Sequence, residues 1–258
     1  IVEALASPQK GLHSSAAEAL TELTTDDGEA ASPLAEGLAH PDRRVRRSVA
    51  EALGRLGGAA RPAAGGVLSA LAEADATYPR ETIDAYLGVL RKVGALPAAG
   101  PILLDLARVD SRLLEGRDAL ALGQLRMNLF CTLARVGVPG EGLPFLREVL
   151  RDGLNDRPYE WSGAARAVWS MGAAGVAAVP ELRLAFDPAY LDVYLMTGPL
   201  MFENEIGTSP RREAVRAIAA IGPGASEALG DLRRLQQLYP SSPNRPGIDA
   251  AIARVAGE

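Results

Sequence analysis

Residues 36–56 read EGLAHPDRRVRRSVAEALGRL, and residues 3–23 read EALASPQKGLHSSAAEALTEL. The two segments start 33 residues apart and are identical at ten of their 21 aligned positions. Self-similarity at a fixed period of roughly 20 to 50 residues is typical of arrays of stacked supersecondary units. The repeat therefore predicts a solenoid, and the spacing of its apolar residues decides which kind.

Apolar residues follow helical spacing in the second copy, at Val45, Val49, Leu53 and Leu56. Such a stripe predicts an amphipathic helix that buries one face against a neighbour. A second, shorter helix is expected after each helix of this kind, in the ranges 32–39, 62–74, 98–109, 142–152, 176–186 and 226–238. The fold class predicted is all-α, a right-handed α-solenoid of stacked antiparallel helix pairs without strands.

A glycine follows the predicted end of the longer helix in successive units. These glycines are Gly57, Gly94, Gly137, Gly172 and Gly222. The residue just beyond a last helical turn often adopts a left-handed conformation, which glycine reaches at the lowest cost. We therefore expect the glycines to end helices, and a last helix over 248–257 to close the chain.

At residues 40–71 the chain resembles a HEAT repeat, especially the short bacterial type that includes the HEAT-like repeats of phycobilin lyases. In that family an Asp and a Val-Arg pair mark the first helix, and here they are Asp42 and Val45-Arg46. The arginine slot is occupied in later units by Arg126 and Arg211, and it is taken by other residues at His13, Ile83 and Trp161. The ladder of arginines typical of the family is therefore predicted to be broken three times. HEAT arrays have many functions, so the resemblance indicates fold rather than activity.

We interpret residues 1–258 as a single HEAT-like array. The chain starts at Ile1 inside a repeat whose first helix is missing, so we expect it to be a fragment of a longer protein. An inter-repeat insertion is expected at 187–208, because two successive helix ends are 50 residues apart there. Long insertions in solenoids usually project from one face.

The composition and the missing motifs limit which kinds of functional site the chain can form. Two histidines and one cysteine are too few for a metal site of the usual ligand types, and no metal or cofactor is expected. Neither a nucleophile elbow nor a phosphate loop occurs, so we predict a protein that is not an enzyme. No apolar run is long enough to span a membrane. The cytoplasm is the favoured compartment, although the sequence carries no signal that decides it.

The densest basic cluster is a candidate anion site. It consists of Arg43, Arg44, Arg46 and Arg47. Guanidinium groups bind phosphates and carboxylates, but arginines on HEAT helices also bond along the stack or lie in solvent. The net charge of −5 disfavours nucleic acid as the main partner, because proteins that follow phosphate backbones are usually basic.

The second half of the chain holds the candidate partner-binding surface, since nine of the twelve aromatic residues lie between 130 and 202. Aromatic and methionine side chains are common anchors at binding surfaces. The residues chosen are Tyr159, Trp161, Tyr190, Tyr194, Met201, Phe202 and Arg211. The insertion could instead pack onto the array as a short amphipathic helix, and Trp169 is expected to fill space between helices.

Together these features predict a non-catalytic interaction module or scaffold that docks a protein or peptide on its concave face. The partner could be another domain of the same polypeptide. Two alternatives stay open at this point. The first is an enzyme or enzyme subunit of the phycobilin lyase type, and the second is binding of an anion or nucleic acid by the four clustered arginines.

Overall fold

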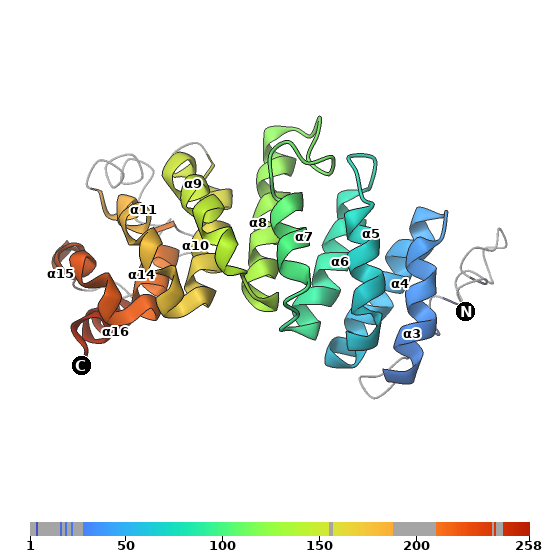
Figure 1. The fold of residues 1–258 in the computed structure, drawn as a ribbon, viewed down its shortest axis with the longest axis horizontal. Helices are drawn as coiled ribbons and strands as arrows, with labels where there is room; N and C mark the ends of the chain where they lie inside the picture. Colours follow the sequence, from blue (N-terminus) through green and yellow to red (C-terminus); the bar gives the residue numbers. More distant parts are fainter. Residues whose placement is uncertain are drawn as a thin grey trace. The chain divides into compact units, whose positions relative to one another are not determined.

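A computed structural model describes residues 4, 16, 19, 22, 28–154, 157–187, 210–238, 240 and 245–258. Every regular element in these ranges is helical (Figure 1). Contacts between residues divide the chain into two compact units, Ile1–Val136 (unit 1) and Gly137–Glu258 (unit 2). Each unit is described by itself, and the single array predicted for residues 1–258 stays a prediction.

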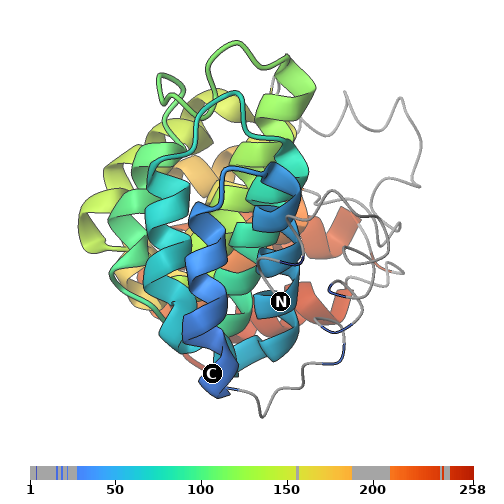
Figure 2. The same cartoon turned by 90° about the vertical axis from the view of Figure 1, so that its right-hand side faces the viewer.

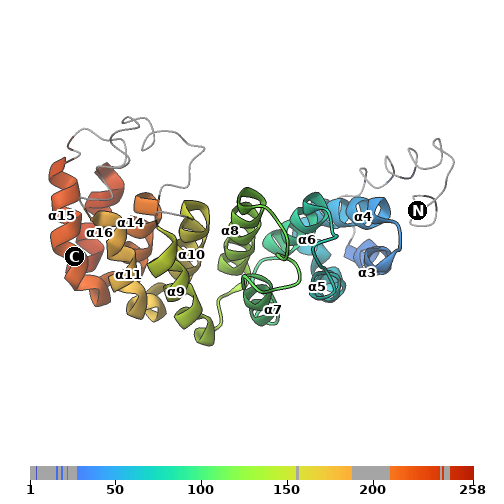
Figure 3. The ribbon, with the colours of Figure 1, turned by 90° about the horizontal axis from the view of Figure 1, so that it is seen from above.

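The described residues of unit 1 form three helix pairs in two layers. One layer holds the helices α3 (Gly28–Glu36), α5 (Ala64–Ala72) and α7 (Ala99–Leu106). The other holds the helices α4 (Arg43–Leu56), α6 (Arg80–Val93) and α8 (Ala119–Val136). Figure 3 shows α4, α6 and α8 above α3, α5 and α7, and neighbours within each layer pack on one another. Figure 2 looks onto the α3 end of the unit, where the blue and cyan helices stand side by side.

Unit 2 repeats the arrangement. Its first layer holds α10 (Pro158–Met171), α14 (Pro210–Ile221) and α16 (Arg245–Ala256), which pack in that order. Its second layer holds α9 (Leu143–Gly153), α11 (Val179–Arg183) and α15 (Leu229–Leu238). Tight 3-10 helices connect or extend the layers, and they are η1 (Gly37–Ala39), η2 (Gly57–Ala63), η3 (Gly140–Gly142), η4 (Gly172–Ala178), η5 (Leu184–Phe186) and η6 (Gly222–Ala228). The predicted all-α solenoid of stacked helix pairs is thus confirmed.

Helix α4 shows why the sequence folds this way. The side chain of Asp42 accepts a hydrogen bond of 2.8 Å from the backbone N–H of Arg44 and so caps the first turn. The predicted stripe is fully buried, with Val45, Val49 and Leu53 all 0 % exposed. Gly57 ends the helix at a φ of +58°, a conformation that side chains other than glycine rarely adopt. All five predicted helix-end glycines have positive φ, which confirms the repeat boundaries.

Candidate functional site

Three helices, α8, α10 and α14, each carry a buried side-chain N–H donor that bonds to the preceding helix of the other layer. In unit 1, Arg126 donates from Nε to the carbonyl oxygen of Ala107 at 2.8 Å. In unit 2, Trp161 donates from Nε1 to the carbonyl of Leu150 at 2.7 Å, and Arg211 donates from Nε to Ala185 at 3.1 Å. Each carbonyl lies in or just after the last turn of the preceding helix, which is α7, α9 or α11, and carbonyl groups there lack intrahelical partners.

Trp161 and Arg211 are therefore structural residues. Trp161 is 0 % exposed and Arg211 is 4 % exposed. The prediction that they border an exposed partner-binding patch is wrong for these two residues, because both side chains point inward to close the preceding helix. The ladder is also less broken than expected, since the indole N–H of Trp161 takes over the donor role of the arginine. The shared donor chemistry of the two side chains is the signal that could have revealed this role from the sequence.

The remaining aromatic candidates separate into two groups. Tyr159, in the first turn of α10, is 46 % exposed and is available to a partner. Four residues lie outside the described part of the chain, namely Tyr190, Tyr194, Met201 and Phe202. The same holds for the insertion at 187–208 beyond Asp187, so its binding role stays a prediction. Trp169 is 44 % exposed and does not fill space between helices as expected.

The four clustered arginines do not form one site. Arg46 donates from Nη1 to the carbonyls of His40 at 2.7 Å and Pro41 at 2.9 Å. Its guanidinium also lies 4.9 Å from the centre of the Tyr78 ring, close enough for a cation–π interaction. Arg46 therefore stabilises the turn before α4. Its guanidinium is not available to an anion, so the prediction that Arg46 belongs to the anion site is wrong.

The other three arginines line a surface hollow of about 350 Å³. Its lining residues are Arg43, Arg44, Arg47, Pro79, Glu81 and Thr82, and we call this site the basic hollow. The arginines come from the first turns of α4, and the other residues come from the start of α6, the next helix of the same layer. The hollow thus exists because α4 and α6 pack side by side with both N-termini at one end.

The three arginines of the basic hollow differ in whether they already bind an acidic residue. Arg47 donates from Nε to the Glu51 carboxylate at 2.7 Å, and this hydrogen bond raises the pKa of Arg47 above its ordinary value. Arg43 and Arg44 are exposed, and their guanidinium groups make no hydrogen bond or ion pair within the described part of the chain. Two permanently charged side chains therefore line the hollow without an ion pair to a described residue, and Glu81 lines the same hollow.

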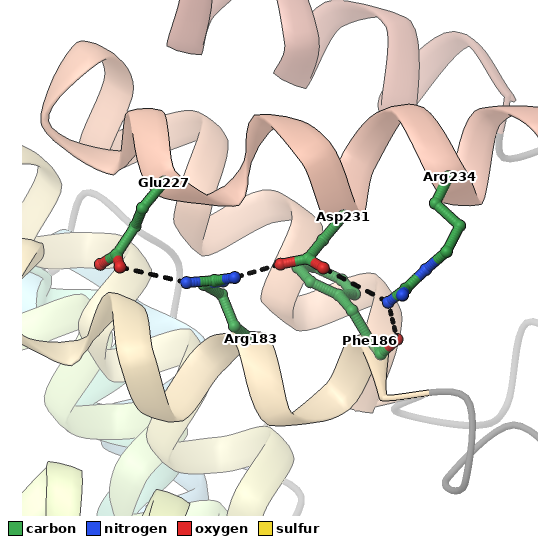
Figure 4. A network of polar contacts seen from close by, with 5 residues as sticks. All are labelled: Arg183, Phe186, Glu227, Asp231 and Arg234. Carbon is green, nitrogen blue, oxygen red and sulfur yellow. Dashed lines mark hydrogen bonds and ion pairs between the residues drawn. The ribbon is translucent and has the colours of Figure 1, made fainter.

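In unit 2, by contrast, arginines bind acidic residues one helix pair further along the stack. Figure 4 shows Arg183 of α11 between two carboxylates of the next pair, with its Nε 2.7 Å from Asp231 and its Nη1 3.1 Å from Glu227. Arg234 reaches the same Asp231 at 3.3 Å and donates to the carbonyl of Phe186 at 2.7 Å. These side chains hold neighbouring helices together.

Two further features of the described residues bear on other classes of function. Nowhere in the ranges given above do three or more His, Cys, Asp or Glu side chains gather so that they could hold a metal ion. None of the described helices combines the length and the apolar character needed to cross a membrane.

Comparison with known proteins bears on the fold. A comparison with curated proteins gives no match. A crystal structure of an engineered protein has 17 % identity and a TM-score of 0.57, with 88 % of this chain and 97 % of that chain covered. A second crystal structure of an engineered protein has 18 % identity and a TM-score of 0.45, with 99 % and 77 % covered. At such identities the first likeness shows the fold alone.

One family model matches part of the chain. Residues 1–88 match the model for HEAT repeats. The finer resemblance to phycobilin lyases stays a prediction. All six residues that line the basic hollow lie within the segment that matches HEAT repeats.

Proposed function

We propose that this chain is a non-catalytic protein-interaction module that docks an acidic segment of a partner protein in the basic hollow. One observation carries the proposal, namely that the exposed residues Arg43 and Arg44 line the hollow and form no ion pair with a described residue. HEAT arrays commonly act as scaffolds for other proteins, which agrees with this class of function.

The chemistry of the hollow suits a carboxylate-bearing peptide. A guanidinium group presents two parallel N–H donors that match the two oxygens of a carboxylate, and such charge-assisted pairs are stronger than neutral hydrogen bonds. Arg43 and Arg44 both line the hollow from the first turn of α4, so a partner could engage both without rearranging the helix. The chain carries a net charge of −5, which repels an acidic segment from most of its surface. The local positive charge of the hollow therefore directs such a segment to this one place.

Nucleic acid suits the hollow less well. A protein that follows a phosphate backbone needs a continuous basic track. The hollow is lined by three arginines, one of which is already bound to Glu51, and it also contains Glu81. This carboxylate would repel successive phosphates of a polymer. A short acidic segment can place its charges at Arg43 and Arg44 alone.

The test is peptide binding measured by fluorescence anisotropy. A dye-labelled oligoglutamate peptide should bind the chain, an oligoglutamine peptide of equal length should not, and added salt should weaken the binding. The double variant R43A/R44A should lose at least about tenfold in affinity, since tenfold corresponds to about 1.4 kcal/mol and two charge-assisted contacts are removed.

A matched control is provided by R61A/R135A, which removes the same charge. Arg61 and Arg135 are exposed residues of unit 1 that do not line the basic hollow. The control should bind oligoglutamate within about threefold of the unaltered chain. Equal losses in both double variants would show that only net charge matters, and binding of oligoglutamine as tight as that of oligoglutamate would overturn the proposal.

A further inference from the structure

We infer that the group recognised in the basic hollow is a phosphorylated side chain of the partner segment, an inference that rests on the proposed function. The observation behind it is Thr82, in the first turn of α6. Thr82 lines the hollow and is only 1 % exposed, yet its hydroxyl makes no hydrogen bond within the described residues. A threonine hydroxyl can both donate and accept hydrogen bonds, and this one uses neither capacity within the described residues. A ligand oxygen in the hollow would satisfy it.

The start of α6 supplies further donors. Its N-cap residue is Pro79, and no side chain caps the helix, whereas Asp42 caps α4. The first N–H groups of a helix have no intrahelical acceptor, and the N-terminus carries a partial positive charge. In α6 the N–H of Thr82 already donates to the carbonyl of Pro79 at 3.0 Å, so the free donors are those of Arg80 and Glu81. The uncapped turn contributes Pro79, Glu81 and Thr82 to the wall of the hollow. An anion seated there would take the place of the missing cap.

Charge and oxygen count favour phosphate over carboxylate. A phosphorylated side chain carries about −1.5 to −2 charges near neutral pH and offers three acceptor oxygens. Arg43 and Arg44 provide two positive charges, and the Thr82 hydroxyl provides a further donor on the wall formed by α6. A carboxylate carries one negative charge, so it would neutralise only one of the two guanidinium groups. The hollow therefore fits the larger anion better.

The negative charge of Glu81 limits how many phosphate groups the hollow can bind. Glu81 lies in the first turn of α6 and lines the hollow together with Arg47, which is bound to Glu51. A single phosphate monoester meets Arg43 and Arg44 while the rest of the peptide extends over the surface. A run of several phosphates would meet Glu81 as well. We therefore assign one phosphorylated residue, not a polyphosphorylated stretch, to this site.

The experiment compares three labelled peptides of one sequence, with phosphothreonine, glutamate or threonine at the central position, on the full chain. The phosphopeptide should bind at least about tenfold more tightly than the glutamate peptide, because a hydrogen bond to a charged group corresponds to about that factor. Inorganic phosphate should compete with it. The variant T82V, which keeps the shape of the side chain and removes the hydroxyl, should abolish most of this preference by lowering phosphopeptide affinity more than glutamate-peptide affinity.

The variant T82S keeps the hydroxyl and should keep the preference, and circular dichroism of both variants verifies that they fold. Equal affinity for the phosphothreonine and glutamate peptides would overturn the inference while leaving the proposed function intact. Retention of the preference by folded T82V would overturn it in the same way. Failure of both charged peptides to bind the unaltered chain would remove the proposed function together with the inference.

Discussion

Arginine is used differently in the two units of this chain. Among the described residues of unit 2, three acidic residues are each shared by two arginines. Glu181 binds Arg147 and Arg151, Glu213 binds Arg166 and Arg216, and Asp231 binds Arg183 and Arg234. In each case at least one arginine comes from the preceding helix pair. In unit 1, Arg43 and Arg44 face a surface hollow and have no acidic partner among the described residues.

The difference teaches that the position of the acids, not the number of arginines, decides the role of each arginine. An arginine bonded to an acid of the next pair holds the stack together. The same side chain without such an acid keeps its charge available to another molecule. The buried donor slot is used alike in both units, by Arg126 in unit 1 and by Trp161 and Arg211 in unit 2.

The largest effect on stability is expected at Trp161, which carries in unit 2 the buried N–H donor that Arg126 carries in unit 1. Replacing this fully buried side chain in W161A should destabilise the protein by about 3–5 kcal/mol, through lost packing and a cavity. The milder variant W161F keeps a ring but leaves the carbonyl of Leu150 without its donor, which should cost about 1–3 kcal/mol. Urea unfolding followed by circular dichroism measures both.

A counterpart in unit 1 is R126M, which removes the donor to Ala107 from the equivalent slot. It should destabilise the protein by an amount similar to W161F. If W161F had no measurable effect while R126M did, the slot would serve different purposes in the two units, and the indole N–H would not be a substitute for the guanidinium.

The fold could be predicted from the sequence because its signals are local. The helical stripe from Val45 to Leu56 and the glycines with positive φ lie within single repeats, and both were found where expected. The glycine signal works because the conformation required at Gly57 or Gly172 excludes most other residues. No knowledge of neighbouring repeats is needed for either signal.

The candidate site depended on neighbours, and the sequence predicted it only in part. Arg43 and Arg44 were identified from their density, but Arg46 is taken up by His40 and Pro41. Thr82 was missed, since a threonine in a first helical turn is an ordinary residue until the neighbouring helix places two arginines at the same hollow. Trp161 was assigned to the surface because its bonding partner, the Leu150 carbonyl, belongs to another helix.

A smaller effect is expected when a shared acid in unit 2 is neutralised. Burial opposes ionisation of Glu181, but hydrogen bonds from Arg147 and Arg151 outweigh it and lower the pKa of Glu181 below its ordinary value. The variant E181Q should lose about 1–2 kcal/mol of stability at pH 7, a range reduced because both arginines are partly exposed.

The pH dependence of this difference follows from the direction of the shift. A carboxyl whose pKa is lower in the folded state contributes fully above its unfolded pKa, about 4.3, and its contribution is lost as the pH falls through the folded pKa. The stability gap between the unaltered chain and E181Q should therefore stay constant from about pH 8 to about pH 5 and close as the pH falls below about 4. The control E148Q changes the same charge at an exposed position of α9 and should show no gap at any pH.

The smallest effect on stability is expected in unit 1, at the two arginines that, unlike those of unit 2, have no acidic partner among the described residues. Because Arg43 and Arg44 make no side-chain bonds to other described residues, R43A/R44A should change the free energy of unfolding by no more than about 0.5 kcal/mol. The unit 2 variant R183A, which loses contacts to Asp231 and Glu227, should cost about 1 kcal/mol. Thermal unfolding of the two variants at low and high salt distinguishes them. A loss above about 1 kcal/mol in R43A/R44A would mean that these arginines stabilise the fold after all. Their positive charges would then interact within the helix stack and would not be available to bind a partner.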